Sequence, residues 1–329
     1  MYAHKKGGGV TTNKTSQLIK IVDSSTGNAL LPHKSTTPQP TVPTVFTFNW
    51  TRCKDIPEEM IVFGHPVAIN RKLHMSGRSN VTRTVLVYTP NQDSWDELPP
   101  PPVRNFTIAT LRGQLLLVGG QDKSIYERTN TILTFDESSR QLVQLSLPRM
   151  PKAITEPAVV EYQNHLIVIG GDESNTTRIA DVNILNTSNK WITAEPLPRT
   201  DDYSTCLIGD TLYLVGQVTK EVFRAHVPSL ISRASSGVWE SVARVTFSWS
   251  SPIAIGNTLL TVGGSDGGKA ISSIHLYDPT KDQWTQCGNL PEEMECCHCI
   301  ELSGKLCVLG GLIRFTTTRS VYTSIPIVV

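Results

Sequence analysis

The sequence lacks the features that would place the protein in a membrane or on a nucleic acid. None of its 329 residues lies in an uninterrupted apolar run of 18, the length that a transmembrane helix needs. No basic run is longer than two residues, and 30 Lys and Arg against 29 Asp and Glu give a formal net charge of +1. We therefore expect neither a nucleic acid nor an anionic membrane as partner.

We expect no secretory signal and no disulfide framework. The first lysines are followed by glycines at residues 7–9 and a polar tract rather than by an apolar core. There are seven cysteines, an odd number that cannot all pair within one chain. We expect a cytoplasmic protein with reduced, mostly buried thiols.

What the sequence does contain is a repeat, an apolar run that ends in paired glycines. Four clear copies carry the pairs Gly119–Gly120, Gly170–Gly171, Gly263–Gly264 and Gly310–Gly311. Two degenerate copies end at Ser76–Gly77 and at Gly216–Gln217. The second positions of these pairs are 43 to 51 residues apart, which is the length of a four-stranded propeller blade.

Each copy has further features at similar distances from the glycines. A two-residue turn of the Gly or Asn type precedes the apolar run, as expected for a tight hairpin. A third strand after the glycines ends in a large residue such as Tyr88 or Tyr277, and a second large anchor follows six or seven residues later. These anchors include Trp95, Trp191 and Trp284.

Paired glycines followed by a tyrosine and then a tryptophan resemble the kelch motif. The resemblance covers about residues 44–329, and it implies an all-β fold, a six-bladed β-propeller with four antiparallel strands in each blade. It also implies that the glycines and tryptophans are structural. The fourth copy departs most from the pattern, because Gln217 replaces its second glycine and a Ser-rich stretch precedes Trp239.

The two ends of the chain are predicted to share one blade. The last copy stops before any tryptophan, whereas the aromatic segment 46–50, ending in Trp50, has no preceding strands of its own. Trp50 and Trp284 each precede an apolar residue and Pro-Glu-Glu-Met at the same spacing. We expect the N-terminal strand to complete the C-terminal blade, which leaves no open edge in the ring.

These patterns divide the chain into two regions. Residues 1–43 are rich in Thr, Ser, Gly and Pro, and we interpret them as a disordered tail or linker, or as the remnant of a preceding domain. The predicted propeller spans 44–329, with repeats at about 61–102, 103–152, 153–199, 200–246, 247–294 and 295–329, the last completed by 44–58.

No metal, cofactor or catalytic residue is predicted. The densest cluster is Cys296-Cys297-His298-Cys299, but adjacent strand residues point to opposite faces and cannot converge on one tetrahedral ion. The histidines at 65, 74, 165, 226, 275 and 298 lie at scattered positions of the repeat and form no recognisable ligand set.

Partner binding is expected where the copies differ, in the loops after the glycines. These loops, at residues 121–130, 172–181, 265–273 and 312–318, mix arginines and aromatics with acids, a composition typical of interfaces. The candidate partner-binding residues are Asp122, Tyr126, Arg128, Asp172, Arg178, Arg314 and Phe315.

The sequence therefore favours a non-catalytic module that binds another protein or peptide. The kelch resemblance implies substrate recognition for a ubiquitin ligase, or cytoskeletal or scaffold binding; it does not extend to BTB or BACK domains. The alternative is a small-molecule enzyme of kelch-like propeller type, a sugar isomerase or an oxidase. A channel mouth lined by converging acids, histidines and arginines would favour that alternative.

Overall fold

A computed structural model describes residues 46–57, 61–78, 83–136, 139–232, 238–314 and 316–328. Its contacts divide the chain into two units, Met1–Thr41 and Val42–Val329, and only the second contains described residues. The proposed tail at 1–43 and the candidate residue Phe315 lie outside the described residues.

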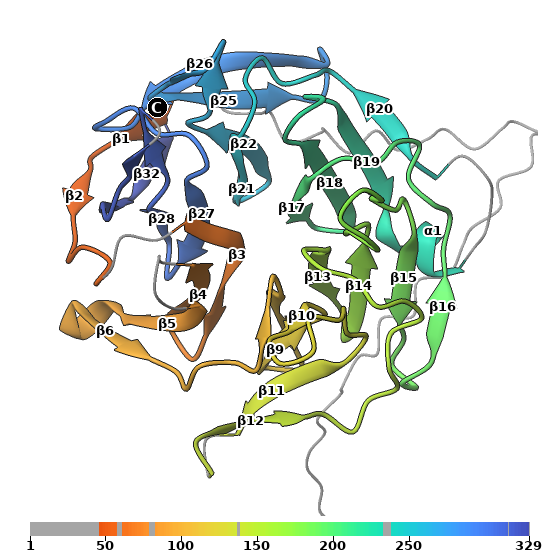
Figure 1. Cartoon of the computed structure of the whole chain (residues 1–329). Helices are drawn as coiled ribbons and strands as arrows, with labels where there is room; N and C mark the ends of the chain where they lie inside the picture. The colour runs from red at the N-terminus through yellow and green to blue at the C-terminus, as the bar shows by residue number, and fades with distance from the viewer. Residues whose placement is uncertain are drawn as a thin grey trace, which may run out of the picture. The chain divides into compact units, whose positions relative to one another are not determined.

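Six four-stranded antiparallel sheets are arranged as blades around a common centre (Figure 1). Blade 1 comprises β3 (Ile61–Ile69), β4 (Lys72–Arg78), β5 (Arg83–Thr89) and β6 (Ser94–Glu97), with a short 3-10 helix (Pro90–Gln92) before β6. Blade 2 comprises β8 (Thr107–Leu111), β9 (Gln114–Val118), β11 (Ile132–Asp136) and β12 (Gln141–Gln144). Blade 3 comprises β13 (Ala158–Tyr162), β14 (His165–Ile169), β15 (Val182–Leu185) and β16 (Trp191–Thr193).

The second half of the ring repeats this arrangement. Blade 4 comprises β17 (Tyr203–Ile208), β18 (Thr211–Gly216), β19 (Val222–His226) and β20 (Glu240–Val242). Blade 5 comprises β21 (Ser251–Ile255), β22 (Thr258–Val262), β25 (Ser273–Asp278) and β26 (Gln283–Asn289). Blade 6 comprises β27 (His298–Leu302), β28 (Lys305–Leu309), β31 (Val321–Ser324) and β2 (Thr51–Arg52). The prediction of a six-bladed propeller is confirmed.

Short two-stranded ribbons accompany the blades. β7 (Val103–Arg104) pairs with β10 (Gln121–Asp122), β23 (Ser265–Asp266) with β24 (Lys269–Ala270), and β29 (Leu312–Ile313) with β30 (Thr316–Thr317). All three involve the residues that directly follow a glycine pair.

Closure by the N-terminal segment is confirmed, but two strands carry it out instead of one. β1 (Phe46–Phe48) pairs with β32 (Pro326–Val328), and β2 then pairs with β31, placing Thr51 opposite Thr323. Between them, the Trp50 indole donates to the carbonyl of Asn289 at the end of blade 5, 2.8 Å away. Phe46 and Phe48 pack into the apolar cluster between blades 5 and 6. The segment therefore contacts blade 5 before β2 joins the sheet of blade 6.

The paired glycines stand where each second strand meets the segment leading to the next blade. Gly263 and Gly264 have φ of +61° and +122°, and the Gly264 N–H donates to the Met294 carbonyl at 2.8 Å. A Cβ on Gly264 would lie 2.7 Å from the carbonyl oxygen of Ser248, closer than side chains pack. Only glycine combines this backbone conformation with this close approach.

Tryptophans on the outer strands link neighbouring blades by hydrogen bonds. In five blades the indole N–H donates to a backbone carbonyl in the segment that leaves the preceding blade. The pairs are Trp50–Asn289 at 2.8 Å, Trp95–Lys54 at 3.1 Å, Trp191–Pro148 at 3.0 Å, Trp239–Glu195 at 3.1 Å and Trp284–Ala243 at 2.8 Å. Blade 2 carries Leu142 at this position.

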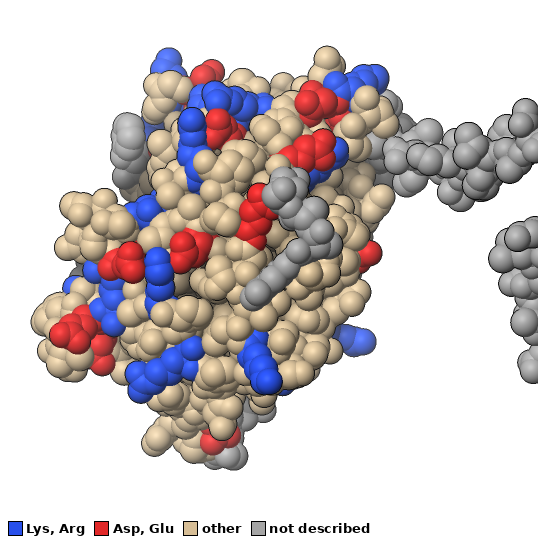
Figure 2. Space-filling view, turned by 90° about the vertical axis from the view of Figure 1, so that its right-hand side faces the viewer, with Lys and Arg blue, Asp and Glu red and all other residues tan. Residues whose placement is uncertain are grey.

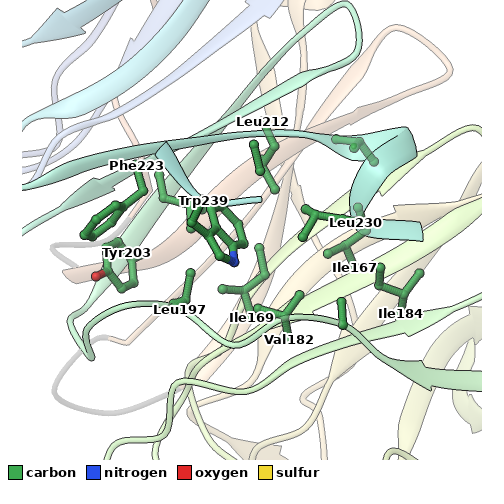
Figure 3. Close-up of a cluster of buried hydrophobic side chains, with 14 of the residues drawn as sticks. Ile167, Ile169, Val182, Ile184, Leu197, Tyr203, Leu212, Phe223, Leu230 and Trp239 are labelled. Carbon is green, nitrogen blue, oxygen red and sulfur yellow. The ribbon is translucent and has the colours of Figure 1, made fainter. Parts of the chain in front are cut away.

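Apolar side chains fill the space between blades, as the interface of blades 3 and 4 illustrates (Figure 3). Ile167 and Ile184 of blade 3 are fully buried in the same cluster as Leu212 and Trp239 of blade 4. The sequence did not predict α1 (Val227–Ser232), a single turn that adds the buried residues Val227 and Leu230 to the cluster. No helix among the described residues is long and apolar enough to cross a membrane.

Candidate functional site: the loop face and the channel mouth

The two faces of the propeller differ in what they expose. In each blade the start of the first strand pairs with the end of the second, as Ala158 does with Ile169, so both lie at the same face. We call this the loop face. It carries the loops after the glycine corners together with the segments that lead into β8, β13, β17, β21 and β27. The turns between first and second strands form the opposite face, the hairpin face.

Five equivalent residues surround the centre of the loop face, each fifteen positions before the second residue of its blade's glycine corner. They are Asn105, Glu156, Asp202, Trp249 and Cys296. All except Asp202 have positive φ, between 52° and 55°. Their backbones also connect neighbouring blades, because Glu156 N–H donates to Asn105 O at 2.9 Å and Cys296 N–H to Trp249 O at 3.0 Å. We call these five residues the mouth ring.

The mouth ring borders a cavity of about 290 Å³ at the centre of the propeller. Four of its members, Glu156, Asp202, Trp249 and Cys296, contribute to the cavity wall. Further lining residues are His65, Thr107, Pro157, Ala158, Val159, Tyr203, Ser204, Gln217, Ser250, Cys297 and His298. Gln217, which replaces a corner glycine, is buried there and donates to the carbonyls of Val215 and Ser250 at 3.1 and 3.2 Å. The most irregular repeat therefore supplies part of the wall.

His65 lies at the boundary between this cavity and a wider groove of about 660 Å³ on the hairpin-face side, and it lines both. It comes from a bulge in β3 where the pairing with β4 shifts register between Phe63 and Val67, an irregularity that redirects a side chain. The backbone N–H of Thr205 in blade 4 donates to its Nε2 at 2.9 Å. A residue of blade 1 thus contacts the opposite side of the ring.

The imidazole of His65 is held neutral. Burial lowers its pKa from 6.5 to about 4, and the bond from Thr205 requires an unprotonated Nε2, so the single ring proton is on Nδ1. His298 lies beside it, with ring centroids 6.4 Å apart and the rings nearly perpendicular. These two histidines, from blades 1 and 6, thus meet at the channel although they occupy different positions of the repeat.

Negative charge exceeds positive charge at the channel mouth. Arg178 makes a bidentate contact with Asp172, in which Nε donates to Oδ1 at 2.7 Å and Nη2 donates to Oδ2 at 3.2 Å. This contact is the largest cause of the raised pKa of Arg178. Asp202 and Glu156 are close enough to raise that pKa further. Burial in turn raises the pKa of Asp202, Arg178 partly offsets the effect, and Asp201 and Asp172 add to it. One arginine therefore faces three carboxylates.

Of the predicted partner-binding residues, the structure brings three together at the junction of blades 2 and 3. Besides the Arg178–Asp172 pair, Arg128 donates to the Asp172 carbonyl at 3.0 Å and to Asn175 Oδ1 at 2.9 Å. These contacts shape the loops, so Arg128 and Arg178 are not free to bind a partner with their full hydrogen-bonding capacity.

The remaining predicted residues lie apart from that cluster. Asp122 accepts hydrogen bonds from the backbone of Ser124 and Ile125 and closes its own turn. Tyr126 is exposed, with Arg104 stacked 5.0 Å from its ring centroid. Arg314 is exposed on blade 6.

Nothing in the described part of the chain forms a metal site, since no group of three His, Cys, Asp or Glu residues there is placed to hold an ion. Cys299 in β27 and Cys297 directly before that strand are both buried. Burial raises the pKa of Cys296 to about 12. The Cys296 thiol therefore remains protonated and unreactive at neutral pH.

Sequence reasoning missed the mouth ring and His65. The ring had a usable signal in its constant fifteen-residue offset from the corners, combined with a different residue type in every copy. Gly64-His65-Pro66 inside an apolar strand was a second signal, because glycine and proline there mark a bulge. No sequence signal indicates the contact between His65 and Thr205, because that contact depends on the diameter of the closed ring.

Six four-stranded sheets closed into a ring, with glycine corners and interblade tryptophans, define a β-propeller. The Kelch motif family model matches residues 250–291, within blade 5. Kelch-like protein 35 of Mus musculus is 25% identical over 246 residues, covering 73% of this chain and 41% of that protein. Kelch-like protein 36 of Mus musculus is 22% identical over 216 residues, covering 62% and 35%.

A solved structure described as "Structure of YjhT" shares the fold with a TM-score of 0.66 at 14% identity, covering 82% of this chain and 95% of that one. The chain is therefore a six-bladed β-propeller with a Kelch motif in blade 5, and its sequence is similar to those of kelch-like proteins. It spans about two fifths, or less, of the length of the curated relatives described above.

Proposed function

We propose that the propeller is a non-catalytic protein-interaction module and that a protein or peptide binds to its loop face. The observation that carries this proposal is the placement of exposed apolar side chains. Ile125 and Tyr126, each 63% exposed, lie on the blade 2 loop, and Val218, 61% exposed, lies on the blade 4 loop. Trp249, 36% exposed, borders the cavity between them. Exposed apolar and aromatic groups around a concave centre are typical of binding surfaces.

The distribution of charge supports a protein partner over a polyanion. On the side shown in Figure 2, Lys and Arg are interspersed with Asp and Glu, without a continuous field of one sign. Several charges of the described residues are paired, as in the Arg224–Glu240 and Lys152–Asp181 contacts at 2.8 and 3.0 Å. Such a surface gives little attraction to a polyanion.

The kelch-type relatives support the same class of function. One of them is described as "Kelch repeat and BTB domain-containing protein 12" of Danio rerio, 22% identical over 224 residues. Substrate recognition for a ubiquitin ligase and cytoskeletal or scaffold binding both need a propeller face that captures a protein. We propose that the loop face has that role here and that the protein acts in the cytoplasm.

Affinity capture with paired variants tests the proposal. The loop-face variant replaces Ile125 and Tyr126 by Ser, and the control replaces Ile325 and Ile327, which are 57% and 47% exposed near the hairpin face. We expect the loop-face variant to lose the proteins that the unaltered propeller recovers and the control to retain them. Equal recovery by both variants would refute the assignment of the face.

The enzyme alternative has the channel-mouth cavity in its favour, since acids and histidines line it. No Lys or Arg belongs to that lining, and His65 is already engaged by Thr205. We therefore place binding ahead of catalysis. Stoichiometric copper in the purified protein would favour an oxidase over the binding module.

A further inference from the structure

We propose that the channel-mouth cavity is a pocket for a basic side chain, the arginine or lysine of a peptide bound to the loop face, with Asp202 as its counter-charge. The inference rests on the proposed function and makes it more specific. It assigns a charge requirement to the partner, and it assigns the recognition of that charge to a residue of the most irregular repeat.

The size of the cavity fits one side chain better than a whole ligand. At about 290 Å³ it lies at the lower limit of pockets that hold drug-sized molecules. Pro157, Ala158 and Val159 provide an apolar wall on one side, against which an aliphatic stem can pack. The charged end of such a side chain would then lie among the polar groups of the lining.

The charge balance of the cavity favours a cation. Its lining includes two carboxylates, Glu156 and Asp202, and no Lys or Arg. Arg178 is the cation that acts on both, but its guanidinium is bound to Asp172 in the two-armed contact already described. Among the described residues, the Asp202 carboxylate has neither a hydrogen bond nor an ion pair. A partly buried carboxylate without a partner gains most from an incoming cation.

Trp249, at the edge of the cavity, can also contribute to binding a cation. Trp249 borders the cavity, with φ of +55° and its backbone bonded to Gln217 and Cys296. Trp249 and Asp202 line the same cavity, and tryptophan is the most favourable partner for cation–π contact with a guanidinium or ammonium. Within the described part of the chain, its indole N–H has no acceptor, unlike those of the other five tryptophans.

That difference provides a spectroscopic test on the whole chain. Labelling with ¹⁵N-tryptophan gives six indole signals, and Trp249→Phe assigns the one that reports on the cavity. We expect arginine amide to shift this signal saturably while citrulline amide, which is neutral and of similar shape, does not. A lysine amide titration shows whether the pocket prefers a planar guanidinium or an ammonium. The same shift with citrulline amide, or none with either cation, overturns the inference.

Two further variants connect the signal to Asp202. Asp202→Asn removes the charge with little change in shape, and we expect it to weaken arginine amide binding at least about tenfold. Asp266→Asn is the matched control, because Asp266 is an exposed acid on the blade 5 loop outside the cavity. The other five indole signals report whether each variant remains folded. Equal binding by the two variants contradicts the role of Asp202.

The failure of this inference is distinguishable from failure of the proposed function. If Asp202→Asn abolishes arginine amide binding but leaves protein capture unchanged, the partner does not use the pocket. The inference is then wrong and the proposed function stands. If the Ile125 and Tyr126 variant leaves capture unchanged, the proposed function is wrong whatever the amide titration shows.

Discussion

The Trp50 indole N–H donates to the backbone carbonyl of Asn289, 2.8 Å away and 239 positions along the chain. The bond joins the N-terminal segment to the last strand of blade 5 immediately before β2 enters blade 6. Four other blades have the same contact, but here it also attaches the N-terminal segment to blade 5.

Trp50→Phe should therefore destabilise the propeller by about 1 kcal/mol, the usual net value of one hydrogen bond. The variant keeps an aromatic side chain but loses the N–H donor. Trp50→Ala should cost about 2–3 kcal/mol, since it also removes packing against Phe48, whose ring centroid lies 5.6 Å away. Thr47→Ala, on the exposed side of β1, is the control. Chemical denaturation measures all three.

Removal of the segment extends this prediction. Deletion of residues 44–56 takes away β1 and β2 and leaves β31 with an unpaired edge, so the melting temperature should fall. Deletion of residues 1–38 should leave it unchanged. Equal melting temperatures for the full chain and the 44–56 deletion would contradict closure through blade 6.

The glycine corners predict a second contrast in stability. Gly264→Ala places a methyl group 2.7 Å from the Ser248 carbonyl oxygen at a φ of +122°, so we expect a loss of about 2–4 kcal/mol. Gly267→Ala nearby meets nothing within 4 Å at a φ of +57° and should cost about 1 kcal/mol. If the two variants lost the same free energy of unfolding within measurement error, the close approach to Ser248 would not be the reason for glycine at position 264.

His65 should make stability depend on pH between about 4 and 6.5. Its pKa is lowered to about 4 in the folded state, so within this range the unfolded chain binds more protons than the folded one. Stability is then highest above about 6.5 and is lost as the pH falls toward 4, by at most about 3 kcal/mol. His74, whose pKa is also lowered to about 4 by burial, adds in the same direction.

His65→Gln removes this titration while an amide oxygen remains to accept the Thr205 bond. The variant should show a flatter profile of unfolding free energy between pH 4 and 6.5 than the unaltered protein. Identical profiles would contradict a neutral, buried His65.

Arg178 and Arg314 should respond differently to replacement by alanine. Arg178→Ala leaves Asp172 without its two-armed partner, and we expect a loss of about 1–2 kcal/mol in thermal unfolding. Arg314→Ala removes an exposed side chain and should change stability by less than about 0.5 kcal/mol. If both variants were equally stable, the Arg178–Asp172 contact would contribute nothing to the loops.

The repeat predicts the ring because its regular residues act locally and identically in each blade. Gly119 and Gly263 bend the chain in the same way, and Trp191 and Trp284 make the same bond to the preceding blade. Offsets between such residues are visible in one sequence. The split of the closing segment into β1 and β2 was not visible, since it depends on how Phe46 and Phe48 pack between blades 5 and 6.

The site was harder to predict because its residues come from different blades. Glu156, Asp202 and Trp249 meet only when the ring closes, and no spacing within one repeat shows that they face one cavity. Arginines in variable loops were a poor guide, because Arg128 and Arg178 are used to shape the loops. The departure of the fourth copy was the better guide, since both Gln217 and Asp202 line the cavity.

Hydrogen–deuterium exchange of the propeller with and without a captured partner shows which face the partner covers. We expect slower exchange in residues 121–130, 172–181, 217–221 and 246–250, around Tyr126, Val218 and Trp249, with unchanged exchange at the hairpin turns. Protection confined to the hairpin turns, at residues 112–113, 163–164, 209–210 and 256–257, would contradict it.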